Sequence, residues 1–244
     1  MSRTPVAFLV LLALVPFLAS SHAEDRPNPP TQAAPADDLT LVKKLLASRH
    51  EYQTSLEQLR EFYRRQNDLE HMRWAEDELV AYHRTSKKAF RLDLDVPPPS
   101  LKPQYNQPEA NDLYRRAMAY KGKGWMSEAD DNMRRAELLF QQLLSLYPQS
   151  DKIADAAYQL GEIYEHRSFK QYRRSVAYYE RCFQWNPHTN TDARLRAARL
   201  YDRTLQDRSK AIALYREVVS HDGDAKRIDE AKKRLTELSA GPPS

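Results

Sequence analysis

The C-terminal half of the chain repeats one pattern of apolar and small residues at intervals of 36 to 39 residues. The residues Ala136, Phe140, Leu143 and Pro148 recur as Ser175, Tyr179, Cys182 and Pro187, and the first three of these recur as Ala211, Tyr215 and Val218. A period of about 34 residues or slightly more is typical of stacked helix–turn–helix units. Because one such unit cannot bury its apolar face alone, neighbouring units must stack. The pattern therefore predicts an all-α solenoid that holds another molecule.

Prolines and glycines divide residues 109–240 into three predicted helix pairs. The pairs are 109–121 with 127–147, 153–166 with 172–185, and 192–205 with 209–220. A last helix, 226–238, is apolar on one side and charged on the other. That composition suits a terminal helix, which has no following neighbour to cover it.

Nine residues are predicted to pack these repeats. Gly161 lets two helix backbones approach closely, Tyr164 and Tyr179 fill the space between helices, and Pro187 cannot continue a helix. Cys182 occupies a position that needs a small buried residue, with a reactive or intermolecular thiol as the alternative. The full set is Ala136, Phe140, Gly161, Tyr164, Tyr179, Cys182, Pro187, Ala211 and Tyr215.

The second unit resembles a tetratricopeptide repeat. It carries Tyr158, Leu160-Gly161 and Tyr164 on its first helix, then Ser175, Tyr179, Cys182 and Pro187. The first unit departs from this pattern by an insertion, and the third has Arg199 where glycine is usual. The string from Phe140 to Tyr164 is also similar to repeats of bacterial envelope adaptors, such as the Tol-Pal-associated cell division coordinators. This resemblance implies an adaptor in the periplasm or at the cell surface.

The first 23 residues are predicted to be a secretory signal peptide. Arg3 precedes an apolar run, Val6 to Ala19, and Ser21-His22-Ala23 follows as a cleavage site. The run is shorter than the roughly 20 residues that a membrane span needs. We expect cleavage after Ala23, with retention as the alternative, and no stable membrane insertion afterwards. This predicts a periplasmic location.

Residues 24–108 form three predicted segments. Residues 24–38 are rich in proline, alanine and acid and are expected to be a disordered tether. Residues 39–95 are helical and form either an antiparallel hairpin that turns at Asn67 or a continuous coiled coil. The coiled coil would use the heptad seam of residues 39–66 to form a homo-oligomer. Residues 96–108 contain five prolines and are expected to be a linker at a domain boundary.

The sequence offers no catalytic set, metal site or cofactor site. No pair of histidines has metal-binding spacing, and no phosphate-binding glycine loop or nucleophile elbow occurs. Carboxylates alternate with lysine and arginine, as they do on solvated helices. The net charge is only +4 and no sequence-reading motif is present, so we expect neither an enzyme nor a nucleic-acid-binding protein.

The predicted binding site is the concave groove lined by the first helices of units two and three. Its residues are Tyr158, Glu162, Glu165, Arg196, Leu200 and Arg203. In one interpretation the acidic and basic halves of this groove grip an extended peptide, because arginine can hold a carboxylate by two hydrogen bonds. In the other, Glu162 or Glu165 simply pairs with an arginine of the next helix.

The leading functional hypothesis is a non-enzymatic exported scaffold that binds an envelope protein or peptide in this groove. The alternative is a binder of an anionic envelope polymer through the arginine-rich segment 167–216, which contains twelve basic residues. Salt distinguishes the two, because binding to a polyanion weakens steeply as ionic strength rises.

Overall fold

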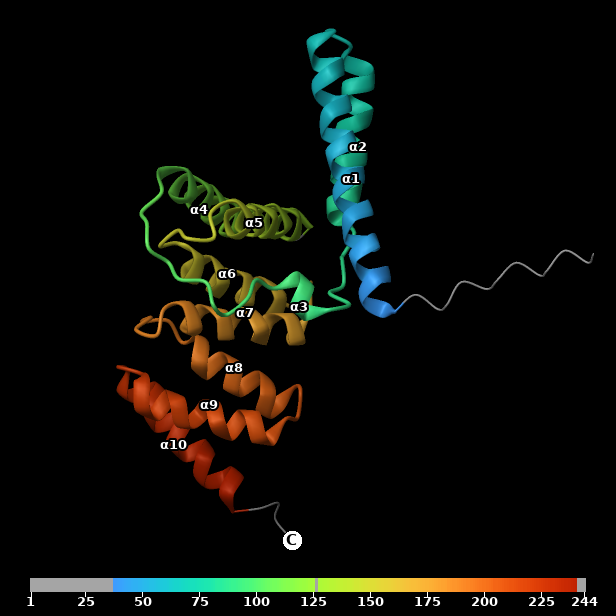
Figure 1. Cartoon of the computed structure of the whole chain (residues 1–244). Helices are drawn as coiled ribbons and strands as arrows, with labels where there is room; N and C mark the ends of the chain where they lie inside the picture. The colour runs from blue at the N-terminus through green and yellow to red at the C-terminus, as the bar shows by residue number, and fades with distance from the viewer. Residues whose placement is uncertain (1–36, 126, 241–244) are drawn as a thin grey trace, which may run out of the picture. The chain divides into compact units, whose positions relative to one another are not determined.

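A computed structural model describes residues 37–125 and 127–240 (Figure 1). This part of the chain is all-α, as predicted, and its only β-type pairing is a single bridge between Tyr105 and Ser150. Its helices are α1 (Asp38–Arg65), α2 (Leu69–Arg84), α3 (Leu92–Asp95), α4 (Pro108–Lys121), α5 (Ser127–Leu146), α6 (Ile153–Glu165), α7 (Tyr172–Trp185), α8 (Ala193–Arg203), α9 (Arg208–His221) and α10 (Ala225–Ser239). The predicted signal peptide and residues 24–36 of the predicted tether lie outside the described residues. None of the described helices is long and apolar enough to cross a membrane.

Helices α4 to α10 pack in chain order as successive pairs (Figure 1). Helix α4 packs on α5, α6 on α7 and α8 on α9, and each pair contacts the next. Helix α10 covers the last pair through Ala231, which is fully buried. The predicted solenoid of helix pairs is confirmed.

The predicted packing residues lie in the core, with one exception. The side chains of Phe140, Tyr164, Tyr179 and Tyr215 are fully buried. So are Ala136, Cys182 and Ala211, and Gly161 is buried on α6. Pro187 is exposed, because it lies just beyond the C-cap of α7 and ends that helix rather than packing inside it.

Helices α1 and α2 form a hairpin, which is one of the two arrangements that the sequence left open. Asn67 adopts a left-handed φ of 56°, and the Asp68 side chain accepts a hydrogen bond from the His71 amide at 3.2 Å. Asp68 therefore caps α2 and the chain reverses. Helix α1 begins at Asp38, which the sequence had placed in the tether.

Two helices cannot cover the whole heptad seam of α1. Leu56 is buried against α2, together with Ala75 and Leu79 of that helix. Leu45, Tyr52 and Leu59 on the other half of the seam remain 36%, 42% and 44% exposed. Of these three, Tyr52 contacts α2, because its ring lies 5.3 Å from that of Tyr82 and its hydroxyl donates to Glu78. The hairpin thus buries one side of the predicted seam and leaves most of the other at the surface.

Residues 96–107 are irregular, as their prolines predict, but they are not a free linker. Val96 is 3% exposed and belongs to the core. Helix α7 binds the next two carbonyls: Arg181 Nε donates to the Pro97 oxygen at 2.6 Å, and Trp185 Nε1 donates to that of Pro98 at 3.1 Å. Carbonyl groups without a helical partner need donors, and α7 supplies them. The segment is a docked strap, and no domain boundary falls at 96–108.

Candidate functional site

The first helices of the repeats carry a chain of ion pairs that runs from one repeat to the next. Lys121 Nζ of α4 lies 2.5 Å from Glu162 Oε2 of α6, and Glu162 Oε1 lies 3.2 Å from Arg196 Nη2 of α8. Farther along, Arg199 of α8 pairs with Glu230 of α10 at 2.5 Å. We call this surface the first-helix face; its residues are Lys121, Tyr158, Glu162, Glu165, Asp192, Arg196, Arg199, Arg203 and Glu230.

Arg196 is the centre of this face. Its guanidinium contacts three carboxylates, with N···O distances of 2.9 Å to Asp192, 3.2 Å to Glu162 and 3.4 Å to Glu165. It also lies 5.8 Å from the centre of the Tyr158 ring, whose hydroxyl donates to Asp192 at 2.7 Å. Burial, followed by the hydrogen bond to Asp192, raises the pKa of Tyr158 above its usual range. Tyr158 is therefore a hydrogen-bond donor at neutral pH.

Four of the six predicted binding residues come together in this cluster, and two do not. Arg196 pairs with Glu162 and Glu165, and the Tyr158 hydroxyl donates to Glu162 at 3.5 Å. This is the internal pairing that the sequence offered as the alternative to a peptide grip. Leu200 is 5% exposed and packs in the core, so its placement on the groove surface was wrong. Arg203 is exposed at the end of α8.

The arginine-rich segment 167–216 is partly neutralised by carboxylates from elsewhere in the chain. Arg174, Arg196 and Arg199 each pair with acidic groups on other helices, and Arg194 lies 3.7 Å from Glu217. Sequence reasoning counted only acids in or near the segment and so overstated its free charge. Seven basic residues of the segment remain exposed, namely Arg167, Lys170, Arg173, Arg203, Arg208, Lys210 and Arg216.

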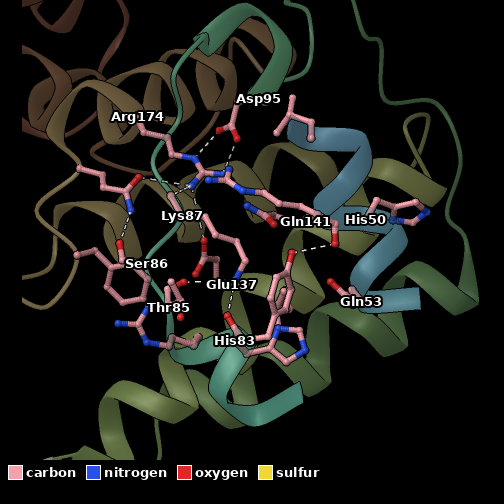
Figure 2. Close-up of a pocket in the computed structure, with 17 residues that line it drawn as sticks. His50, Gln53, His83, Thr85, Ser86, Lys87, Asp95, Glu137, Gln141 and Arg174 are labelled. Carbon is pink, nitrogen blue, oxygen red and sulfur yellow. Dashed lines mark hydrogen bonds and ion pairs between the residues drawn. The ribbon is translucent and has the colours of Figure 1, made fainter. Parts of the chain in front are cut away.

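Sequence reasoning missed a polar cavity between the hairpin and the first two repeats (Figure 2). We call it the hairpin cavity; its volume is about 210 Å³. It is lined by α1, the end of α2, residues 85–87, Asp95, helix α5 and the start of α7. No single stretch of sequence signals it, because its wall comes from segments far apart in the chain.

Arg174 holds one wall of this cavity together. Its guanidinium bonds to Asp95, with Nη2 donating at 2.8 Å, and lies 4.1 Å from the centre of the Tyr164 ring. Glu137 is 3.8 Å from Arg174 and accepts a hydrogen bond from the Tyr164 hydroxyl at 2.7 Å. Figure 2 shows Asp95, Arg174 and Glu137 converging from three different elements.

Burial dominates the electrostatics of the cavity. It raises the pKa of the Asp95 and Glu137 carboxyls, against the opposing charge of Arg174. It also lowers the pKa of Lys87, and burial followed by the Lys87 charge lowers that of His83. The described residues contain no group of three His, Cys, Asp or Glu side chains that could hold a metal ion.

Three segments of the chain match family models of the tetratricopeptide repeat: residues 113–150, 154–189 and 192–225. These segments correspond to the helix pairs α4–α5, α6–α7 and α8–α9. No significant match was found among curated proteins, and none among solved structures.

Proposed function

We propose that this chain, a tetratricopeptide repeat protein, is a non-enzymatic exported scaffold that binds a protein or peptide of the cell envelope. The observation that carries the proposal is the run of three matched helix pairs, because such repeats generally serve protein–protein interaction. Export and a periplasmic location rest first on the N-terminal signal pattern. The resemblance to envelope adaptors supports the choice of compartment.

The first-helix face is the proposed docking surface. It presents Tyr158 and Arg196, residue types that often dominate binding energy at interfaces. Their mutual bonds hold both side chains in place before a partner arrives, which reduces the entropy lost on binding. Arg203 adds an exposed cation beside them, so a partner with an acidic segment is favoured.

The second candidate is recognition of an anionic envelope polymer. The seven exposed basic residues of segment 167–216 favour it. Against it, the internal pairing of Arg174, Arg196 and Arg199 with carboxylates removes much of the positive charge that the sequence suggested. The two candidates differ in salt dependence, since surface charges act over only about 8 Å at physiological ionic strength.

The test is a crosslinked pull-down from the predicted compartment with the full chain and the variants Arg203→Glu and Arg216→Glu. Both positions are exposed, so both variants should fold. We expect Arg203→Glu to lose a specific protein partner and Arg216→Glu to keep it. If neither variant changes the captured protein, the first-helix face is not the docking surface.

Two further measurements separate the remaining parts of the proposal. A captured polysaccharide whose binding falls steeply with salt, and falls equally in both variants, would favour the polymer candidate. Cell fractionation with mass determination of the mature N-terminus tests export. A chain that keeps residues 1–23 in the cytoplasm would contradict the assigned compartment without affecting the docking surface.

A further inference from the structure

The hairpin cavity carries more positive than negative charge. Four cationic side chains line it, Arg49, Lys87, Arg134 and Arg174, against only two carboxylates, Asp95 and Glu137. Both carboxylates pair with Arg174, and the charge of Glu137 also acts on Arg134 and Lys87. Among the described residues, no carboxylate lies within ion-pair distance of Arg49, Lys87 or Arg134.

The charges that line the cavity act on one another. Among the charges that act on Lys87, that of Glu137 is the largest and those of Arg49 and Arg134 follow, and the charge of Arg49 also reaches Asp95. The guanidinium of Arg134 lies 5.0 Å from the centre of the Phe169 ring, which also lines the cavity. The Lys87 ammonium donates to the Tyr82 and Thr85 carbonyls at 2.6 and 3.3 Å, so it is fixed at the cavity wall. Like charges that are partly withdrawn from water repel one another unless an anion joins them.

The cavity also holds a polar atom without a partner. The Nδ1 atom of His83 is buried and forms no hydrogen bond within the described residues. An unpaired buried polar group costs about 1–3 kcal/mol, so a ligand that offers it a partner would be favoured. Figure 2 shows His83 and His50 on the side of the cavity away from Asp95 and Arg174.

The size of the cavity limits the ligand. Its volume of about 210 Å³ is below the range of roughly 300–1,000 Å³ that is usual for sites of whole small molecules. It would hold roughly seven waters at about 30 Å³ each. One carboxylate or phosphate group with part of its carrier fits this space, and a larger carrier would extend past the exposed His50, Thr85 and Ser86 into solvent.

We propose that the hairpin cavity binds a single oxyanionic group, a carboxylate or a phosphate, between Arg49, Lys87 and Arg134. Arginine pairs with both groups by parallel hydrogen bonds, and lysine serves as a point charge. The cavity shares no residue with the first-helix face, so this site is independent of the proposed scaffold function. A bound anion would join the hairpin to the repeats, because Arg49 belongs to α1 and Arg134 to α5.

The test is calorimetric titration of the full chain with inorganic phosphate or acetate, at constant ionic strength set with chloride. Arg49→Gln and Arg134→Gln remove one cation each, and Arg216→Gln removes an exposed cation far along the chain as the matched control. We expect saturable binding at one site, weakened about tenfold or more by either cavity variant and unchanged by the control. Melting of each variant without anion checks that it is folded.

A second pair of probes identifies the source of the anion. A short peptide with a free C-terminal carboxylate and its amidated form differ only in that group. Binding of the free form alone assigns a peptide carboxylate, and binding of phosphate alone assigns a phosphate. The proposal is overturned if no probe saturates by about 10 mM, well above a millimolar dissociation constant, or if both cavity variants bind as tightly as the control.

Discussion

Gly161 of α6 and Tyr179 of α7 pack so closely that a Cβ atom at the glycine would lie 2.5 Å from Cδ1 and Cε1 of the ring. The ring has no room to move, because Tyr179 is fully buried and its hydroxyl donates to Glu165 at 2.7 Å. The glycine of the Leu160-Gly161 motif therefore permits close packing of α6 against α7, as its position in the repeat predicts.

Replacement of this glycine should destabilise the protein. Gly161→Ala gains up to about 1 kcal/mol in helix propensity, but overpacking a core typically costs about 1–3 kcal/mol, and this clash is severe. We expect a lower free energy of unfolding in urea. Gly223→Ala is the control, since a Cβ there meets no atom within 4 Å. Equal stability of Gly161→Ala and the parent would contradict the packing described.

Removal of Arg174 should have a larger effect. Arg174→Leu leaves the carboxylates of Asp95 and Glu137 buried without their cation, and breaking such a pair costs about 3–5 kcal/mol. The double variant Arg174→Leu/Asp95→Leu should recover part of this loss. Thermal and urea unfolding measure both.

A matched surface pair provides the control for Arg174. Arg115 pairs with Asp112 at 2.6 Å, but the two side chains are 77% and 46% exposed. We expect Arg115→Ala to cost less than about 1 kcal/mol, because solvent screens exposed pairs. Similar losses at Arg115 and Arg174 would show that Asp95, the last residue of α3, is not paired with Arg174 as described.

The protein should lose stability at alkaline pH through its buried tyrosines. Burial raises the pKa of eight of them, to about 12 for Tyr114 and Tyr215. The others are Tyr82, Tyr158, Tyr164, Tyr178, Tyr179 and Tyr201. Above the unfolded pKa of about 10 the folded state holds more protons than the unfolded chain, so the free energy of unfolding falls as pH rises toward about 12.

Urea unfolding at several pH values between about 9 and 11 measures how steeply the free energy of unfolding falls with pH. Tyr178→Phe removes one titrating group and a single hydrogen bond, in which the hydroxyl donates to the Asp95 carbonyl at 3.2 Å. The variant should therefore show a shallower fall. The prediction is contradicted if the free energy of unfolding of the parent does not change over this pH range, or if it falls equally steeply in the parent and in Tyr178→Phe.

Cys182 should behave as a packing residue. It is fully buried, burial raises the pKa of its thiol, and its Sγ lies 3.5 Å from the Thr191 hydroxyl. We expect thiol reagents to label the folded protein about a thousandfold more slowly than the urea-unfolded chain, because reaction waits for opening. Rapid labelling of the folded protein would favour the reactive thiol that the sequence left as the alternative.

Features set by short stretches of sequence were predictable. The spacing of Phe140, Tyr179 and Tyr215 predicts the helix pairs, because each repeat buries one large aromatic residue at the same position of its second helix. Asn67 and Asp68 mark a turn through their own local chemistry. The prolines of 96–108 exclude a helix, but nothing in them shows that their carbonyls face donors on α7.

Features made by charge were predictable only in part, because the effect of a charge depends on its neighbours in space. The pairing of Glu162 and Glu165 with Arg196 was one of two interpretations that the sequence offered, and the other pairings were not anticipated. The arginine-rich segment looks strongly basic as a string, yet Arg174 finds its partner Asp95 79 residues earlier in the chain. Leu200 follows the periodicity of a surface position and is buried all the same, since the α8 face that bears it packs against its neighbours. The hairpin cavity depends on Arg49 and Arg134 meeting across two elements, which only the packing of the hairpin on α5 brings about. Periodicity alone thus establishes the repeats and their buried rings, whereas the pairing of the charges exists only once distant helices lie side by side.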